Sequence, residues 1–288
     1  MTMTPMERIR KLQETRGFRF TKSLGQNFLT DDNILRKMAQ AADLSPEDAV
    51  IEIGPGAGVV TDMLLRMTGS VLAVEIDKNL IPFLQETLGH HPHLTLWHQD
   101  VLEAPLSDWI REQRQAGFQR VKVVGNLPYY VTTPIVMKLL EEELPVNLML
   151  FMVQKEVARR LSAQPGTKDY SGLTVAVQRY CRAEKIFDVS PRVFVPPPRV
   201  DSAVVRLIKH PEPTPVLENP ALFFRVVKAA FGQRRKTLLN ALSAMPDAGG
   251  KERVLQCLNQ VAIDPSRRGE TLSVEEFAKL AQAFHPKG

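Results

Sequence analysis

Cysteine is scarce in this sequence, since only Cys181 and Cys257 occur among 288 residues. Two cysteines cannot form a disulfide framework or complete a structural zinc site, so we expect both to be buried or inert thiols. The sequence also lacks any run close to the ~20 apolar residues of a membrane span. Residues 1–22 contain no apolar stretch that resembles a signal peptide. These absences predict a protein of the reducing cytoplasm that does not enter the membrane.

Histidine is rare as well, with six residues, three of which are His90, His91 and His93. Pro92 interrupts this run, and no cysteine or carboxylate lies near it in the sequence. The usual ligands of a metal site are therefore incomplete. We interpret the run as an exposed connector and expect the protein to hold no metal.

Positive charge is abundant, with a formal net charge of +5 and a pI near 9.2. Basic residues cluster in three places: the amino-terminal 30 residues, the stretch from Arg159 to Arg206, and Arg234 to Lys236. The first cluster contains Arg8, Arg10, Lys11, Arg16, Arg19 and Lys22. A single cluster of this kind is usually a solvated helix face. Three of them in one basic chain favour a partner with a phosphate backbone.

A glycine-rich turn follows the first strongly apolar run. Residues 49–53 read as a buried strand, and the turn Gly54-Pro55-Gly56-Ala57-Gly58 leads into a segment of helical spacing. Such a turn lets a ligand approach the backbone closely. About 20 residues further on, at the end of the apolar run 71–74, Glu75 is placed to hold a ribose diol. The pattern suits either NAD or S-adenosylmethionine.

Two details of this region favour the methyl donor. Glu52 lies inside the first strand, and Pro55 occupies a position where a pyrophosphate binder would present a backbone N–H. Asp100, which follows the predicted strand 94–99, can accept a hydrogen bond from an adenine amine. An NAD dehydrogenase remains the alternative from the glycine turn alone, but no acid–base group of that class is evident.

A second glycine, Gly125, closes the apolar run 121–124 and is followed by Asn126, Leu127, Pro128 and Tyr129. This loop lies at the carboxyl end of a predicted strand, where open α/β sheets bind ligands. The Asn126 side-chain oxygen and the Leu127 carbonyl can accept both N–H bonds of an exocyclic amine, while Tyr129 covers the base. Four residues in isolation also fit a proline-containing turn with a surface tyrosine.

The order of the predicted elements indicates an α/β fold. Strands expected at 49–53, 71–74, 94–99, 121–124 and 148–153 alternate with helical segments, which predicts a parallel sheet. Runs at 185–189 and 202–208 have no room for a helix between them and should form an antiparallel pair at the sheet edge. Residues 210–216 resemble a proline-rich linker. We place the domains at 1–209 and 217–288, the second wholly helical.

Five segments are informative when taken together: residues 24–29 (LGQNFL), 52–58 (EIGPGAG), 126–129 (NLPY), 194–202 (FVPPPRVDS) and 231–237 (FGQRRKT). Over nearly the whole chain they resemble the family of bacterial small-subunit ribosomal RNA adenine dimethyltransferases, the kasugamycin-sensitivity type. The resemblance implies a Rossmann-like S-adenosylmethionine-dependent methyltransferase sheet with a small helical carboxyl-terminal domain that binds RNA and the ribosome. The sequence departs from the family pattern at Leu24, at Leu239 and around Tyr170, which concerns the RNA contacts more than the chemistry.

The resemblance also implies roles for individual residues. Cofactor binding falls to Asn27, Leu29, Gly54, Gly56, Glu75, Asp100 and Asn126, and target binding to Asn126, Leu127, Tyr129 and Phe194, with Phe194 stacking on a flipped adenine opposite Tyr129. The expected reaction is dimethylation of two adjacent adenosines near the 3′ end of 16S rRNA, in the immature 30S subunit, by a cytoplasmic monomer.

Two functional alternatives share this fold. One is the macrolide-resistance type of dimethyltransferase that acts on 23S rRNA, against which the segment 231–237 argues. The other is a non-catalytic assembly or transcription factor, which should have lost Glu75, Asp100 or Asn126. All three residues are present.

Overall fold

The structure is a computed structural model that describes residues 3–15, 18, 20–21, 24–142 and 144–285. Internal contacts divide the chain into two compact units. The first unit comprises Met1–Ala158 and Glu184–Lys209, and the second comprises Arg159–Ala183 and His210–Gly288. The basic residues Arg16, Arg19 and Lys22 of the predicted amino-terminal cluster lie outside the described residues.

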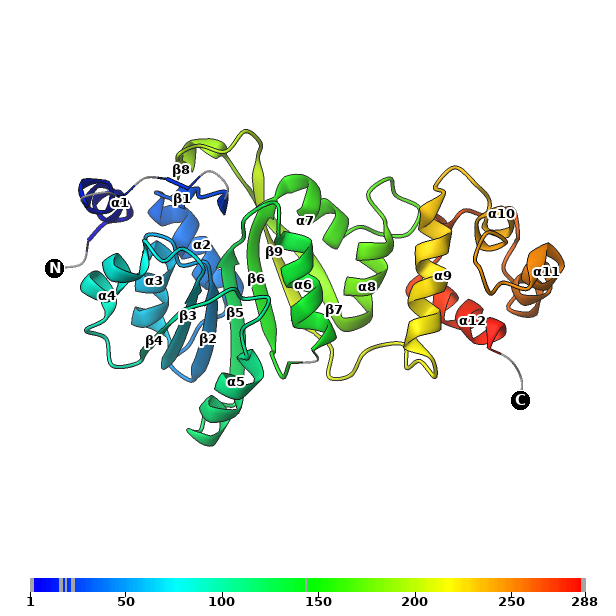
Figure 1. Cartoon of the computed structure of the whole chain (residues 1–288), viewed down its shortest axis with the longest axis horizontal. Helices are drawn as coiled ribbons and strands as arrows, with labels where there is room; N and C mark the ends of the chain where they lie inside the picture. Colours follow the sequence, from blue (N-terminus) through cyan, green and yellow to red (C-terminus); the bar gives the residue numbers. More distant parts are fainter. Residues whose placement is uncertain (1–2, 16–17, 19, 22–23, 143, 286–288) are drawn as a thin grey trace. The chain divides into compact units, whose positions relative to one another are not determined.

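The first unit is built around a seven-stranded sheet of order β4-β3-β2-β5-β6-β9-β7 (Figure 1). Its strands are β2 (Asp48–Ile53), β3 (Ser70–Glu75), β4 (Leu94–His98), β5 (Arg120–Asn126), β6 (Leu148–Gln154), β7 (Cys181–Val189) and β9 (Ser202–Lys209). Strands β2 to β6 pair in parallel with their neighbours, and β9 runs antiparallel to β6. The expectation of a Rossmann-like α/β sheet is confirmed, with the two late strands β9 and β7 at one edge.

Helices separate the parallel strands along the chain. The first unit contains α1 (Pro5–Glu14), α2 (Asp32–Ala42), α3 (Val59–Met67), α4 (Ile81–Leu88), α5 (Leu106–Gln115) and α6 (Thr132–Glu141), while α7 (Lys155–Leu161) crosses the boundary between the units. A short 3-10 helix, η2 (Pro191–Val193), precedes β8 (Phe194–Val195), which pairs antiparallel with β1 (Phe28–Leu29). The strands β2 and β3 are buried along their whole length, which explains why most of their residues are apolar instead of alternating between apolar and polar.

Strand register decides which residues meet at the carboxyl edge of the sheet. Ile53 of β2 pairs with Val74 of β3 on one side and with Gly125 of β5 on the other. The next residue of each strand is therefore Gly54, Glu75 and Asn126 respectively. These three residues, 72 positions apart at the extremes, become neighbours because parallel strands end at the same edge.

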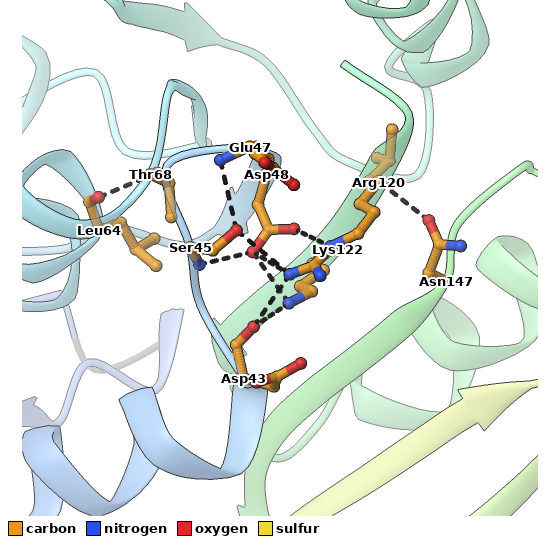
Figure 2. A network of polar contacts seen from close by, with 10 residues as sticks. Asp43, Ser45, Glu47, Asp48, Leu64, Thr68, Arg120, Lys122 and Asn147 are labelled. Atoms are coloured by element: carbon orange, nitrogen blue, oxygen red, sulfur yellow. Dashed lines mark hydrogen bonds and ion pairs between the residues drawn. The ribbon is translucent and has the colours of Figure 1, made fainter.

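At the amino-terminal ends of the parallel strands, a buried ionic network holds β2 and β5 together, as shown in Figure 2. Asp48, which is fully buried, accepts from Arg120 Nε at 2.7 Å and from Lys122 Nζ at 2.9 Å. Lys122 also donates to the Asp43 carbonyl. Burial alone would raise the pKa of Asp48, but the hydrogen bonds from the two cations outweigh it and hold that pKa below its usual range. The network locks the starts of β2 and β5 in register.

The second unit is helical, with α8 (Gly172–Tyr180), α9 (Pro220–Gly232), α10 (Leu238–Leu242), α11 (Gly250–Gln260), α12 (Val274–Phe284) and the 3-10 helix η3 (Gly269–Thr271). Its core includes Phe223 and Phe277 together with Tyr170 and Val175 from the region of α8. Residues 159–183 therefore pack with the carboxyl-terminal helices, although they precede the predicted linker. Within 210–216, His210 N and Thr214 N donate to carbonyls of α8.

Candidate functional site

A cavity of about 320 Å³ opens at the carboxyl edge of the sheet in the first unit. It is lined by the ends of β2, β3 and β5, by residues 99–102 after β4, and by the loop 24–29. This is the edge at which open α/β sheets bind ligands. All of the predicted site residues except Phe194 line it: Asn27, Leu29, Gly54, Gly56, Glu75, Asp100, Asn126, Leu127 and Tyr129.

The glycine turn has the backbone geometry that its sequence predicts. Gly54 and Gly56 have φ values of 69° and 59°, in the left-handed region that residues with a Cβ seldom adopt. A Cβ on Gly56 would approach the Phe28 ring to 2.9 Å, whereas a Cβ on Gly54 would meet no atom within 4 Å. Gly56 thus permits close packing of the loop 24–29. The space beside Gly54 is open to a ligand.

Glu75 is buried and ends β3 with its carboxylate held by the backbone. Its Oε2 accepts from Gly56 N at 3.1 Å, and its Oε1 accepts from Asp77 N at 2.8 Å. Burial raises the pKa of Glu75, and the backbone hydrogen bonds partly offset that rise. Each oxygen keeps a further lone pair, so the oriented carboxylate can also accept from a pair of vicinal hydroxyls.

The loop 24–29 is tied to the same region through a side-chain bond. Gln26 Nε2 donates to Asp77 Oδ2 at 2.7 Å, two residues beyond Glu75. Asp100 is half-buried after β4, and its Oδ1 accepts from Leu102 N at 2.9 Å. Ile76 also lines the cavity with its side chain exposed. Sequence reasoning missed Ile76, although a large apolar residue directly after Glu75, the predicted ribose-binding acid, is a usable signal for the face of a flat ring.

Glu52 is a second acidic residue on the cavity wall, and sequence reasoning did not place it in the site. Its side chain is 2 % exposed, and within the described part of the chain its Oε2 has no hydrogen-bond partner. Burial raises the pKa of Glu52 to about 8, and the nearby charge of Glu75 adds to the effect. The signal in the sequence was a lone carboxyl within an otherwise apolar strand, which seldom occurs without a functional reason.

Asn126 is oriented by a hydrogen bond that crosses the cavity lip. Its Nδ2 donates to the Asn27 carbonyl at 2.9 Å, while Asn27 Nδ2 donates to the Gly25 carbonyl at 2.8 Å. Because the amide nitrogen is engaged, the carboxamide has a fixed orientation, and its oxygen has no donor among the described residues. An acceptor of defined direction therefore stands at the cavity.

The two predicted aromatic residues differ in their surroundings. Tyr129 is half-buried, and its hydroxyl bonds Ser202 Oγ at 2.6 Å. Burial raises the pKa of the Tyr129 phenol, and the Ser202 bond partly offsets the rise. Phe194, in β8 (Phe194–Val195), is 3 % exposed and pairs with Leu29 of β1 (Phe28–Leu29). Phe194 is not among the residues that line the cavity, and its ring packs in the core cluster that also contains Leu29. Its role in stacking stays a prediction.

The predicted basic clusters are partly used in internal contacts. Arg8 is buried and pairs with Asp62 at 3.3 Å, and Lys11 pairs with Glu86 at 2.8 Å. In the second unit, Arg234 Nη2 donates to the Lys168 carbonyl at 2.6 Å, and its Nε lies 3.5 Å from Glu270. Exposed cations that follow it are Arg235 and Lys236.

Among the residues that the structure describes, no helix combines the length and the apolar character that a membrane span requires. No group of three or more His, Cys, Asp or Glu side chains in the same residues could hold a metal ion. In the histidine run, the ring centroids of His90 and His91 lie 4.3 Å apart. The Nε2 atom of His93 forms a hydrogen bond with the Leu65 carbonyl at 2.9 Å.

Solved structures with the same fold identify the class of protein. A dimethyladenosine transferase from Plasmodium falciparum is 26% identical with a TM-score of 0.72, over 88% of this chain and 95% of that one. The 23S rRNA methyltransferase ErmE is 28% identical with a TM-score of 0.67, over 90% and 99% of the two chains. By fold and by the cavity at the sheet edge, the protein is an S-adenosylmethionine-dependent methyltransferase.

The chain belongs to the ribosomal RNA adenine dimethylase family, whose model matches residues 17–285. The protein named ribosomal RNA small subunit methyltransferase A in Geobacillus kaustophilus is 52% identical to this chain. The match covers 97% of this chain and 96% of the relative. The relative of that name in Alkaliphilus metalliredigens is 51% identical over 92% of each chain. These identities are well above the 28% shared with the 23S rRNA enzyme, so the large-subunit alternative is not favoured.

Proposed function

We propose that this enzyme transfers methyl groups from S-adenosylmethionine to the N6 amines of two adjacent adenosines, dimethylating each, in a loop near the 3′ end of 16S rRNA. Its relatives carry the name of a small-subunit methyltransferase. The observation that carries the chemistry is the Asn126 carboxamide, held by the Asn27 carbonyl with its oxygen available at the cavity. That oxygen is the acceptor an exocyclic amine requires.

The cofactor side of the cavity fits an adenosyl sulfonium compound. Glu75 accepts from the ribose hydroxyls, Asp100 accepts from the adenine amine, and Gly54 leaves room beneath the ligand. Asn27 and Leu29 close the loop 24–29 over it, with Gly56 allowing that loop to pack closely. When bound, the methyl donor supplies an electrophilic methyl group. Glu52 places a carboxyl on the wall beside it, with one oxygen unpartnered in the described structure.

The target side orients a weak nucleophile. An aryl amine delocalises its lone pair into the ring, and acceptance of its two N–H bonds by Asn126 Oδ1 and the Leu127 carbonyl favours a tetrahedral nitrogen. Alignment of this kind contributes up to ~7–11 kcal/mol in well-oriented reactions. The nitrogen is cationic after methyl transfer and loses its proton to water, so the residues need not supply a strong base.

The target adenosine must leave its stack to reach the cavity, and unstacking costs a few kcal/mol. Tyr129 offers its ring face at the rim, and stacking of a base on an aromatic side chain returns ~1–3 kcal/mol. The hydrogen bond to Ser202 Oγ fixes the Tyr129 ring before the base arrives. Phe194 completes the stack if the segment around β8 releases its ring from the core.

The enzyme binds the ribosomal particle through its basic surface, and the cavity at the sheet edge holds only the target adenosine and the methyl donor. Residues 217–288, with Arg235 and Lys236 exposed, form the RNA-binding and ribosome-binding domain in this proposal. The partner is the immature 30S subunit, and the enzyme works as a monomer in the cytoplasm. Since a single flipped adenine offers little sequence information, phosphate contacts must set the register.

The test is methyl transfer from labelled donor to small subunits isolated without adenine dimethylation. Wild-type protein is expected to yield N6,N6-dimethyladenosine in 16S rRNA, confined to adjacent positions near the 3′ end. The Asn126→Ala variant is expected to yield little product. Large subunits serve as the matched control. Label in 23S rRNA, or no label in either particle, would contradict the proposal.

A further inference from the structure

Tyr130 is an unusually exposed aromatic side chain at the rim of the cavity. It lies in the turn between β5 and α6, directly after Tyr129, and it lines the same cavity. Its side chain is 60% exposed, whereas Tyr129 is half-buried and bonded to Ser202. A Cβ built on Gly25 would lie 3.8 Å from two ring carbons of Tyr130. The ring therefore stands beside the loop 24–29 at the mouth of the cavity.

Packing within the first unit does not account for an aromatic residue at this position. A tyrosine that leaves most of its surface in water gains little from folding, because apolar burial is what stabilises a large side chain. The residue is placed next to the acceptors for the target amine, and it shares a turn with Tyr129. Because the residue both lines the cavity and is mostly exposed, it can contact the part of an RNA substrate that stays outside the cavity.

An RNA strand that has lost one base from its stack needs a partner for the neighbouring base. Removal of the target adenosine exposes a face of the adjacent base, and unstacked bases are commonly held on aromatic side chains in proteins that bind single-stranded RNA. The proposed substrate has two adjacent adenosines, so the neighbouring base is itself an adenine with a large π-face.

We infer that Tyr130 is a substrate-positioning residue, whose exposed ring stacks on the base next to the adenosine in the cavity. The inference rests on the proposed function and names a second base-binding site beside the first. The ring holds the neighbouring nucleotide while Tyr129 and Asn126 engage the target. It thereby aligns the strand so that either of two consecutive adenosines can be presented.

The experiment measures steady-state methylation of unmethylated small subunits by wild type, Tyr130→Ala, Tyr130→Leu and Tyr130→Phe, with donor affinity by calorimetry. Tyr130→Ala should raise the KM for the subunit about tenfold, equivalent to about 1.4 kcal/mol, while kcat changes less and donor affinity is unchanged. Tyr130→Phe keeps the ring and should resemble wild type. Tyr130→Leu keeps apolar area without a ring and should resemble Tyr130→Ala. Val216→Ala, which truncates an exposed apolar side chain outside the cavity and outside residues 217–288, is the control.

Each other outcome overturns the inference in a distinct way. A KM of Tyr130→Ala within twofold of wild type would mean that the ring does not touch RNA. A Tyr130→Phe variant as weak as Tyr130→Ala would assign the contact to the hydroxyl, and Tyr130→Leu equal to wild type would assign it to apolar area. A parallel loss of donor affinity would place Tyr130 in the cofactor site. Failure of the wild-type enzyme itself to methylate adenosine would instead refute the proposed function.

Discussion

Replacement of Glu52 by Gln should remove much of the pH dependence of stability from the first unit. Burial raises the pKa of Glu52 from 4.5 to about 8 in the folded protein. Between these values the folded state keeps a proton that the unfolded state has released, so each pH unit lowers the free energy of unfolding by about 1.4 kcal/mol. Stability from this group is greatest below pH 4.5 and is lost as the pH rises to about 8.

Between pH 4.5 and about pH 8, ionisation of Glu52 lowers the free energy of unfolding by at most ~5 kcal/mol. Relaxation of the site around the charged carboxylate makes this loss smaller. Glu52→Gln keeps a neutral side chain of similar shape at every pH, so the variant should match wild type near pH 5 and exceed its stability by several kcal/mol at pH 8. Glu75, whose pKa burial also raises, leaves a residual slope in both proteins.

Urea unfolding between pH 5 and pH 9, followed by tryptophan fluorescence, measures this difference. Both tryptophans, Trp97 and Trp109, lie in the first unit and report on its unfolding. Glu112→Gln, which neutralises an exposed carboxyl in α5, is the matched control. Parallel stability curves for wild type and Glu52→Gln would show that the Glu52 carboxyl is ionised in the folded protein and would refute the reasoning.

Three further outcomes are expected. Asn126→Ala should lower kcat on the order of 100-fold with subunit affinity nearly unchanged, because the acceptor acts on the reacting amine; normal turnover with lost RNA binding would contradict this. Glu75→Ala should weaken donor binding in calorimetry at least about tenfold, or ~1.4 kcal/mol, and tight NAD binding by wild type would contradict the assigned cofactor. The double variant Arg235→Ala/Lys236→Ala, which spares Arg234 and its bond to the Lys168 carbonyl, should flatten the salt dependence of subunit binding by roughly 0.7–0.9 per lost phosphate contact. Donor affinity should stay constant, and equal salt slopes would move the docking surface elsewhere.

Much of the cofactor side could be predicted because it depends on local patterns. An apolar run ended by glycines specifies a buried strand and a turn, and an acid at the end of the next strand follows the same rule. Parallel pairing then brings Gly54, Glu75 and Asn126 to one edge, as the register confirms. The assigned contacts with ligand stay predictions; the structure shows only that nine of the ten predicted residues, all except Phe194, line one cavity.

The sequence predicted the type of sheet and the edge position of its last two strands, but not the register between individual strands. Alternation of strands and helices indicated a parallel sheet, and the short connection between the last two strands indicated their place at an edge. The sequence could not show that Ser202, at the start of β9, pairs opposite Gln154 and thereby reaches the Tyr129 hydroxyl. That contact arises from the register of β6 and β9, which local sequence does not encode.

The sequence by itself determined the sheet, the glycine turn and the types of side chain at its edge, because periodicity and turn chemistry act over a few residues. Tertiary structure alone decided burial: it placed Phe194 in the core beside Leu29, paired Arg8 with Asp62, and joined residues 159–183 to the carboxyl-terminal helices. It also gave Glu52 its raised pKa. Burial and charge pairing depend on segments that are distant in the chain, so they are fixed only when those segments pack together.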